Sequence, residues 1–183
     1  MNERAARDSN RTREAVMHAA RELVAAKGTG VSLAEVAELA GVSKGGLLHH
    51  FPSRDALFDA MRRDGIVRFR DGVMRLVDLS ENRPGKILRA YIRALCGGDP
   101  EAMEAFGTSP LWNGVNETKE LLEELGENGE RWMRELTADG LDEGRVRLIM
   151  RAAEGFAAAA SFGEESPETL AEARATLLQM TYD

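Results

Sequence analysis

Residues 29–51 bring together side chains that can hydrogen-bond to a nucleic acid. Lys44 lies at the start of a predicted short helix, where an ammonium group can donate to the acceptor atoms of guanine. Thr29 and Ser32 lie at the start of the preceding predicted helix, where hydroxyl and backbone N–H groups can bind phosphate. The alternatives are a solvated lysine and simple helix capping, and capping is compatible with phosphate contact. These residue types indicate noncovalent recognition.

No constellation typical of catalysis is evident. The chain has no Gly-rich phosphate loop and no H-E-x-x-H motif. His49 and His50 form a poor metal pair because adjacent helical positions do not face each other, and packing near Phe51 is the alternative. The single cysteine, Cys96, excludes an internal disulfide and a cysteine-based metal site. Cys96 is either a redox sensor or a buried small hydrophobe, and we favour the second. We expect no metal, no cofactor and no enzymatic activity.

The stretch 32–51, SLAEVAELAGVSKGGLLHHF, has the pattern of two short helices joined by a tight turn. Ser32 and Glu35 have the spacing of a capping box, and Gly41 can end the first helix in the left-handed conformation. Ser43 can then cap a second helix over residues 44–51. Two such helices form a helix-turn-helix, whose second helix enters the major groove of DNA.

The remaining segments predict an all-α fold. Composition is that of a globular protein, with 43% hydrophobic and 30% charged residues. No apolar run is long enough to span a membrane, so no membrane partner and a cytoplasmic location are expected. The first ten residues read as polar and frayed. Helical spacing predicts further helices over 11–27, 53–79, 86–95, 100–106, 117–137, 142–162 and 167–180.

The net charge of −7 is unevenly distributed. Residues 1–55 carry a formal charge of +1 and all three histidines, whereas residues 56–183 carry −8. Phosphate would repel the acidic part, and the near-neutral part can approach it if its basic residues share a face. The asymmetry weakly favours a DNA-facing head, since an acidic surface also serves solubility.

The phrase AGVSKG, followed by HF, Ser53 and Leu57, resembles the tetracycline-repressor (TetR) family of bacterial transcription regulators. The resemblance at the level of motifs covers residues 11–62. It implies an N-terminal three-helix DNA-binding domain over residues 1–53 and a C-terminal helical ligand-binding and dimerisation domain over residues 54–183. It also implies a homodimer that binds a near-palindromic double-stranded operator and is released by a small-molecule effector.

The resemblance carries over DNA-contact roles to particular residues. His50 matches a position that touches phosphate, with His49 beside it, and Arg54 stands where the family usually has a phosphate-binding lysine. Two positions depart from the family, which commonly has threonine at Gly46 and tyrosine at Leu48. Leu48 cannot hydrogen-bond to phosphate, but it could contact a thymine methyl group. The candidate DNA-contact residues are Thr29, Ser32, Ser43, Lys44, Gly45, Gly46, Leu48, His49, His50 and Arg54.

Candidate ligand residues are apolar and aromatic side chains at helical spacing in the C-terminal part. Such residues are more often plain core than ligand wall, so about half of them are expected to line a cavity between helices. Tyr91 and Trp112 would supply polar groups. A hydrophobic or aromatic effector is expected. The candidates are Phe69, Leu88, Tyr91, Leu95, Met103, Phe106, Trp112, Trp132, Met133 and Phe156.

The resemblance places the dimer interface on the last two predicted helices. The small face of Ala153, Ala157 and Ala160 agrees, because small residues allow helices to approach closely. The full set of candidates is Ile149, Ala153, Ala157, Ala160, Leu170, Ala173 and Leu177.

Three functions are therefore considered. A ligand-responsive repressor is the leading one. A transcriptional activator or a ligand-independent DNA binder is an alternative that the sequence does not separate from it. A helical ligand carrier or enzyme with a degenerate helix-turn-helix is the third and least favoured.

Overall fold

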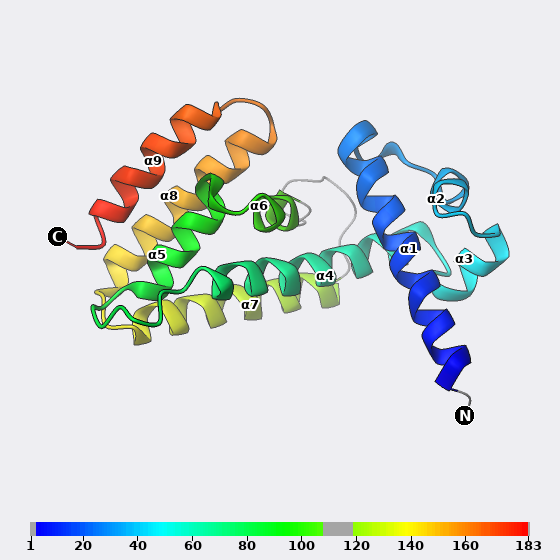
Figure 1. Cartoon of the computed structure of the whole chain (residues 1–183), viewed down its shortest axis with the longest axis horizontal. Coiled ribbons are helices and arrows are strands. Elements are labelled where there is room, and N and C mark those ends of the chain that lie inside the picture. Colours follow the sequence, from blue (N-terminus) through cyan, green and yellow to red (C-terminus); the bar gives the residue numbers. More distant parts are fainter. Residues whose placement is uncertain (1–2, 108–118, 183) are drawn as a thin grey trace. The chain divides into compact units, whose positions relative to one another are not determined.

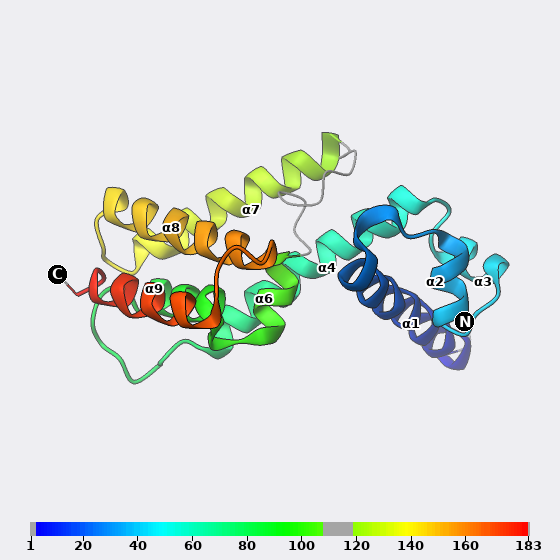
Figure 2. The same cartoon turned by 90° about the horizontal axis from the view of Figure 1, so that it is seen from above.

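The computed structural model describes residues 3–107 and 119–182 (Figures 1 and 2). These residues are helical with connecting turns and contain no strand, as the all-α prediction requires. They form two compact units. We call residues 3–63 the N-terminal unit, and residues 64–107 together with 119–182 the C-terminal unit. No helix in the described part of the chain is long and apolar enough to cross a membrane.

The N-terminal unit is a small helical bundle. Its core contains Val16, Ala20, Leu47, Phe51 and Leu57, which are each at most 2% exposed. Helix α1 packs against both α2 and α3 (Figure 1). The elements are α1 (Glu3–Lys27), the 3-10 turn η1 (Gly28–Gly30), α2 (Leu33–Leu39), α3 (Lys44–His50) and the first part of α4 (Arg54–Arg75).

Helix α1 begins earlier than the sequence predicted. The first ten residues were expected to be frayed, but the helix starts at Glu3. Alanine and arginine are frequent here and are among the best helix formers, which favours the added turns. The Thr12 hydroxyl also donates to the carbonyl oxygen of Asp8, at 3.0 Å. Helix α1 is therefore longer at its N-terminal end than the sequence predicted.

The predicted turn between α2 and α3 is confirmed in detail. Gly41 takes a φ of +66°, and the bonds Val42 N–H to Ala37 O and Gly41 N–H to Glu38 O complete a Schellman motif. At the other end of α2 the capping box between Ser32 and Glu35 is present. Both ends of α2 are therefore fixed by local hydrogen bonds.

The C-terminal unit surrounds the buried helix α5 (Lys86–Arg93), which contacts α7, α8 and α9 (Figures 1 and 2). After α5 the π-helical segment η2 (Ala94–Gly98) turns the chain, with Gly97 at a φ of +83°. The other helices are the second part of α4, α6 (Pro100–Gly107), α7 (Lys119–Ala138), α8 (Glu143–Ser161) and α9 (Pro167–Gln179).

Helices α4 and α6 contact each other closely at Gly72. A Cβ atom at this position would lie 2.8 Å from the Cβ of Ala102. Real Cβ atoms do not approach so closely, so only glycine permits this packing. Helix α4 continues to Arg75, somewhat short of the predicted end at residue 79.

Candidate nucleic-acid interface and ligand site

Helix α3 presents one side to the core and another to solvent. Leu47 is completely buried and anchors the helix, whereas Lys44, Gly45, Leu48 and His49 are exposed. The Ser43 hydroxyl accepts a hydrogen bond from the backbone N–H of Gly46, at 3.0 Å, which confirms the predicted cap. The short helix is therefore held by its cap and by Leu47 while its outer face stays open to a partner.

His49 and His50 end this helix. Their ring centroids are 5.4 Å apart in an edge-on arrangement, and the ring of His50 lies 6.4 Å from that of Phe51. No group of three or more metal-ligating side chains exists among the described residues. His50 is half-buried and His49 is exposed.

The hydroxyl group at the start of α2 is engaged in the capping box. Glu35 accepts hydrogen bonds from the backbone N–H of Ser32 at 2.9 Å and from its hydroxyl at 2.8 Å. These bonds, with the nearby ammonium of Lys27, lower the pKa of Glu35 from its ordinary 4.5 to about 2. Capping thus accounts for the observed contacts of Ser32, and its phosphate contact stays a prediction.

Arg54 makes backbone contacts that the sequence did not reveal. Its guanidinium donates to the carbonyl oxygens of Thr29 and Val31, and it lies over the ring of Phe58 at 4.7 Å. Arg54 thus connects the first turn of α4 to the segment before α2. A guanidinium has five N–H donors, so these two bonds leave capacity for phosphate.

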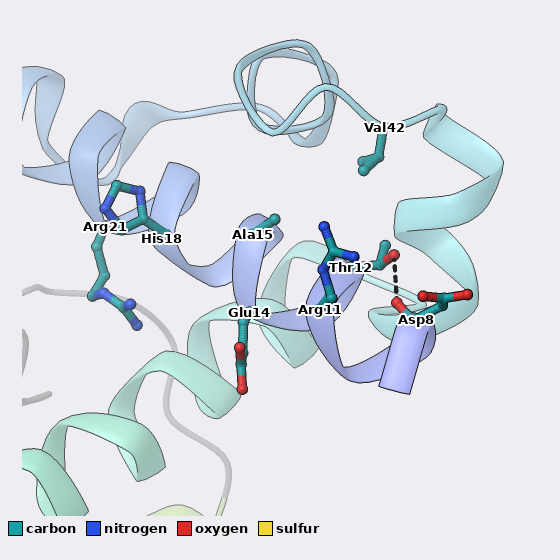
Figure 3. A pocket seen from close by; sticks show the side chains of 8 residues that line it. All are labelled: Asp8, Arg11, Thr12, Glu14, Ala15, His18, Arg21 and Val42. Atoms are coloured by element: carbon teal, nitrogen blue, oxygen red, sulfur yellow. Dashed lines mark hydrogen bonds between the residues drawn. The ribbon is translucent and has the colours of Figure 1, made fainter. Parts of the chain in front are cut away.

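An open groove of about 800 Å³ lies along α1 in the N-terminal unit (Figure 3). Seven of its lining residues come from α1, and the eighth, Val42, comes from the turn between α2 and α3. The groove is lined by two carboxylates and two guanidinium groups, whose formal charges cancel. The sequence did not predict this groove, and none of the ligand candidates lines it. Its residues are Asp8, Arg11, Thr12, Glu14, Ala15, His18, Arg21 and Val42.

The ligand candidates gather in one place. Trp112 lies outside the described residues; the other nine all belong to the hydrophobic cluster of the C-terminal unit or pack against it. Six are buried and three, Met103, Met133 and Phe156, are partly buried. This grouping does not distinguish core from ligand wall, so the role of these residues stays a prediction.

Four of these side chains form an aromatic cluster, which we define as Phe69, Tyr91, Phe106 and Trp132. The ring of Phe69 lies 5.3 Å from Tyr91, 5.6 Å from Phe106 and 5.9 Å from Trp132. Tyr91 and Trp132 are 5.1 Å apart and meet edge to face. Helices α4, α5, α6 and α7 each contribute one ring, so the cluster joins four elements.

Charged side chains at the aromatic cluster were missed by the sequence reasoning. The Tyr91 hydroxyl donates to Glu154 at 2.8 Å, and Glu154 also pairs with Arg151 at 2.6 Å. Burial, with the adjacent carboxylate, raises the pKa of Tyr91 well above its ordinary value, so the hydroxyl keeps its proton. The sequence could not single out Glu154, because the chain carries 31 acidic residues without a distinguishing motif.

A second charged group lies against Trp132. The guanidinium of Arg70 is 5.0 Å from the Trp132 ring centroid, and its Nη2 lies 2.7 and 2.8 Å from the oxygens of Glu135. Burial raises the pKa of Glu135, but the hydrogen bonds from Arg70 and Arg131 outweigh it and hold that pKa below its ordinary value. Glu135 is therefore a carboxylate at neutral pH.

Most dimer candidates face the chain's own core. Ile149, Ala153, Ala157 and Leu177 belong to the hydrophobic cluster of the C-terminal unit, and Leu170 and Ala173 are each 7% exposed. Ala160 is half-buried. These residues are thus used within one chain, and their contact with a second copy is not tested by the structure.

Cys96 lies in η2 and is completely buried. Burial raises the pKa of its thiol to about 11, in spite of the nearby Arg174. Such a thiol carries almost no thiolate at neutral pH and reacts slowly. This favours the reading of a small hydrophobe over that of a redox sensor.

Comparisons with known proteins support this architecture. A search of curated protein sequences finds no match to the chain. Among solved structures, a transcriptional regulator from Rhodococcus sp. Rha1 is 24% identical, with a TM-score of 0.72 over 92% of this chain and 95% of that one. A TetR transcription regulator from Haloarcula marismortui is 17% identical, with a TM-score of 0.71 over 93% of this chain and 96% of that one.

A third similar structure is NalD of Pseudomonas aeruginosa, the secondary repressor of the MexAB-OprM multidrug efflux pump. It is 20% identical, with a TM-score of 0.62 over 95% of this chain and 97% of that one. At these identities the three likenesses establish the fold. The model described as bacterial regulatory proteins, tetR family, matches residues 16–61, and the model described as tetracyclin repressor-like, C-terminal domain, matches residues 85–182. Since the second match alone covers more than half of the sequence, the chain belongs to the TetR family, whose members are transcription regulators and not enzymes.

Proposed function

We propose that the chain is a homodimeric repressor that binds a near-palindromic operator and releases it when a small effector with a hydrophobic or aromatic body binds the C-terminal unit. The observation that carries the proposal is the exposed face of α3, with Lys44, Gly45, Leu48 and His49 held outward by the buried Leu47. A short helix so presented fits the major groove.

The proposed DNA contacts divide into two kinds. Lys44 donates to base edges at the start of α3, and Leu48 contacts a thymine methyl group. His50, Thr29, Ser32 and Arg54 contact phosphate, which positions the protein without reading sequence. Ser43, Gly45, Gly46 and His49 complete the surface, and the two glycines let the backbone approach the DNA closely.

Helix α4 is the element through which an effector can act. It contributes Leu57 and Met61 to the core of the N-terminal unit, and Phe69 and Val73 to that of the C-terminal unit. An effector that packs beside Phe69 and prefers one position of α4 shifts the population away from the DNA-binding state. Its affinity for the two states must differ for this to occur.

The proposed dimer uses α8 and α9. Their buried faces serve the chain's own core, so the surface available to a second copy is the outward one. This surface carries Leu148 on α8 and Phe162, which directly follows α8; they are 62% and 59% exposed, with the exposed Gly155 midway between them. Positions seven residues apart lie on nearly the same helix face, so Leu148 and Gly155 share one side of α8, and Phe162 follows at the end of that helix.

The test is fluorescence anisotropy of the purified protein with duplex DNA from around its own gene, at several salt concentrations. Lys44→Ala is expected to relax sequence preference, costing about 1–3 kcal/mol at the base pair it contacts. His50→Ala is expected to weaken binding to all duplexes by a similar factor, because a phosphate contact does not read sequence.

Lys119→Ala is the matched control, because it removes the same charge from an 85% exposed side chain of the C-terminal unit. Wild-type binding without preference for any duplex, in that region and in a genome-wide selection, would contradict the proposal. Equal effects of Lys44→Ala and Lys119→Ala would remove Lys44 from the interface.

A further inference from the structure

We propose that the effector carries an anionic oxygen group, such as a carboxylate, on an aromatic or apolar body, and that Arg70 binds this group at the edge of the aromatic cluster. This inference rests on the proposed effector function of the C-terminal unit and names the chemical class of the ligand. The residues that carry it are Arg70, Glu135, Arg131 and Trp132.

Arg70 has a buried donor without a partner. Its Nη2 bonds to both oxygens of Glu135, but its Nη1 is buried and finds no hydrogen-bond acceptor in the part of the chain that the structure describes. A buried N–H without an acceptor is costly, and native proteins rarely leave one unpaired. An acceptor atom supplied by a ligand would remove this cost.

The local charges favour an anion as that acceptor. Glu135 receives hydrogen bonds from two guanidinium groups, those of Arg70 and Arg131. Two positive charges thus share one carboxylate, and the group has a surplus of one positive charge. Glu154, the other carboxylate at the cluster, is engaged by Tyr91 and Arg151. A carboxylate ligand would neutralise the surplus, and its two oxygens suit a guanidinium.

The same geometry disfavours a cationic ligand. Aromatic clusters often bind cations through the negative faces of their rings. Here the guanidinium of Arg70 already lies over Trp132, at 5.0 Å from the ring centroid. A second cation at this ring would meet like charge.

The position of Arg70 makes it reachable. The side chains of Arg70 and Glu135 are 21% and 28% exposed, whereas Trp132 is 3% exposed and Phe69 is 6% exposed. The charged pair is therefore partly exposed, next to side chains of the aromatic cluster that are buried.

The test is isothermal titration calorimetry of the full chain with three matched probes: 4-phenylbutanoate, 4-phenylbutanamide and 4-phenylbutylamine. These share one apolar body and carry a negative, neutral or positive group. The carboxylate is expected to bind about tenfold or more tightly than the amide, as a charge-assisted hydrogen bond implies, and the amine is expected to bind most weakly.

Two variants with opposite expected effects separate ligand contact from structural support. Arg70→Met, which keeps an apolar stem, should weaken carboxylate binding about tenfold and leave amide binding nearly unchanged. Glu135→Gln should strengthen carboxylate binding, because it removes the competing internal anion. Arg68→Met is the matched control on the same helix, since Arg68 pairs with Glu101 and Glu104. Circular dichroism melting confirms that each variant folds.

Equal binding of all three probes, tightest binding of the amine, or no carboxylate binding would overturn the inference. Weaker carboxylate binding in both Arg70→Met and Glu135→Gln would also overturn the inference. If the pair were purely structural, the loss of either partner would weaken binding in the same way. Anisotropy with operator DNA is measured on the same samples. Preserved operator binding and its release by another ligand would leave the proposed function standing while this inference fails.

Discussion

Arg54 donates a hydrogen bond from its Nε atom to the carbonyl oxygen of Val31, at 3.0 Å. The whole helix-turn-helix lies between the two residues in the sequence. The bond therefore connects the first residue of α4 to the segment before α2. Val31 is buried and Arg54 is half-buried, which places the contact away from bulk solvent. The orientation of α2 toward α4 in the N-terminal unit therefore depends partly on one side chain.

We expect Arg54→Met to lower the free energy of unfolding by about 1–3 kcal/mol, because backbone carbonyls lose a charged donor. Urea unfolding followed by circular dichroism measures this. The control is Arg147→Met, which removes an exposed arginine from an i,i+4 pair on α8. If Arg54 served only as a phosphate contact, the two variants would unfold alike and only Arg54→Met would lose affinity for DNA.

The capping box at α2 predicts a dependence of stability on pH. The folded pKa of Glu35 is lowered from 4.5 to about 2, so the unfolded state binds the proton more readily. The stabilisation is thus complete above the unfolded pKa and is lost as pH falls from about 4.5 toward about 2. Glu35→Gln should flatten the pH dependence of unfolding in that window.

The comparison for Glu35→Gln is Glu38→Gln, which lies on the same helix but outside the capping box. Unfolding of all three proteins is followed at several pH values between 2 and 4.5, the range of the shift. The wild type and Glu38→Gln should keep the same slope. A slope for Glu35→Gln equal to theirs would mean that the capping box contributes nothing to stability.

The features predicted best are those set by near neighbours in the sequence. The capping box of Ser32 and Glu35 and the glycine turn at Gly41 depend on residues at most a few positions apart, so spacing alone reveals them. The contact of Arg70 with Glu135 joins residues 65 positions apart, and arginine and glutamate are too common to mark it. Only the fold brings such a pair together.

The small face of α8 shows a different limit. Its alanines were expected to allow close approach of a helix at the dimer interface, and Ala153 and Ala157 are completely buried in the chain's own core. A pattern of small residues indicates that another element packs closely against the helix. It does not indicate whether that element belongs to the same chain. Here the neighbour is the chain's own core, so the proposed dimer surface lies on the other side of the helix.

The close contact of Gly72 with Ala102 predicts that alanine substitutions at two glycines change stability in opposite directions. Gly72→Ala should destabilise the C-terminal unit by about 1–3 kcal/mol, because the added Cβ atom would meet Ala102. Gly126→Ala, in α7, should stabilise it by about 0.4–1 kcal/mol, since its Cβ atom would meet nothing within 4 Å. Thermal unfolding of both variants measures this. Stabilisation by Gly72→Ala would show that α4 and α6 can separate at no cost.

The buried arginine of α5 carries the last prediction. Arg89 is completely buried, and its guanidinium bonds to Glu81 at 2.9 and 3.0 Å and to the hydroxyl of Thr181 at 3.1 Å. It also lies over the ring of Tyr182, at 4.6 Å. This one side chain thus ties the segment before α5 to the residues that follow α9.

Arg89→Met should cost about 3–5 kcal/mol, because it leaves the carboxylate of Glu81 partly buried without its cation. A second change, Glu81→Leu, should restore part of this loss, since an apolar pair can replace a buried ion pair at little cost. Urea unfolding of the single and double variants measures both terms. Arg134→Met, at a 69% exposed side chain, is the control. A double variant less stable than Arg89→Met alone would show that Glu81 stabilises the unit through contacts other than this ion pair.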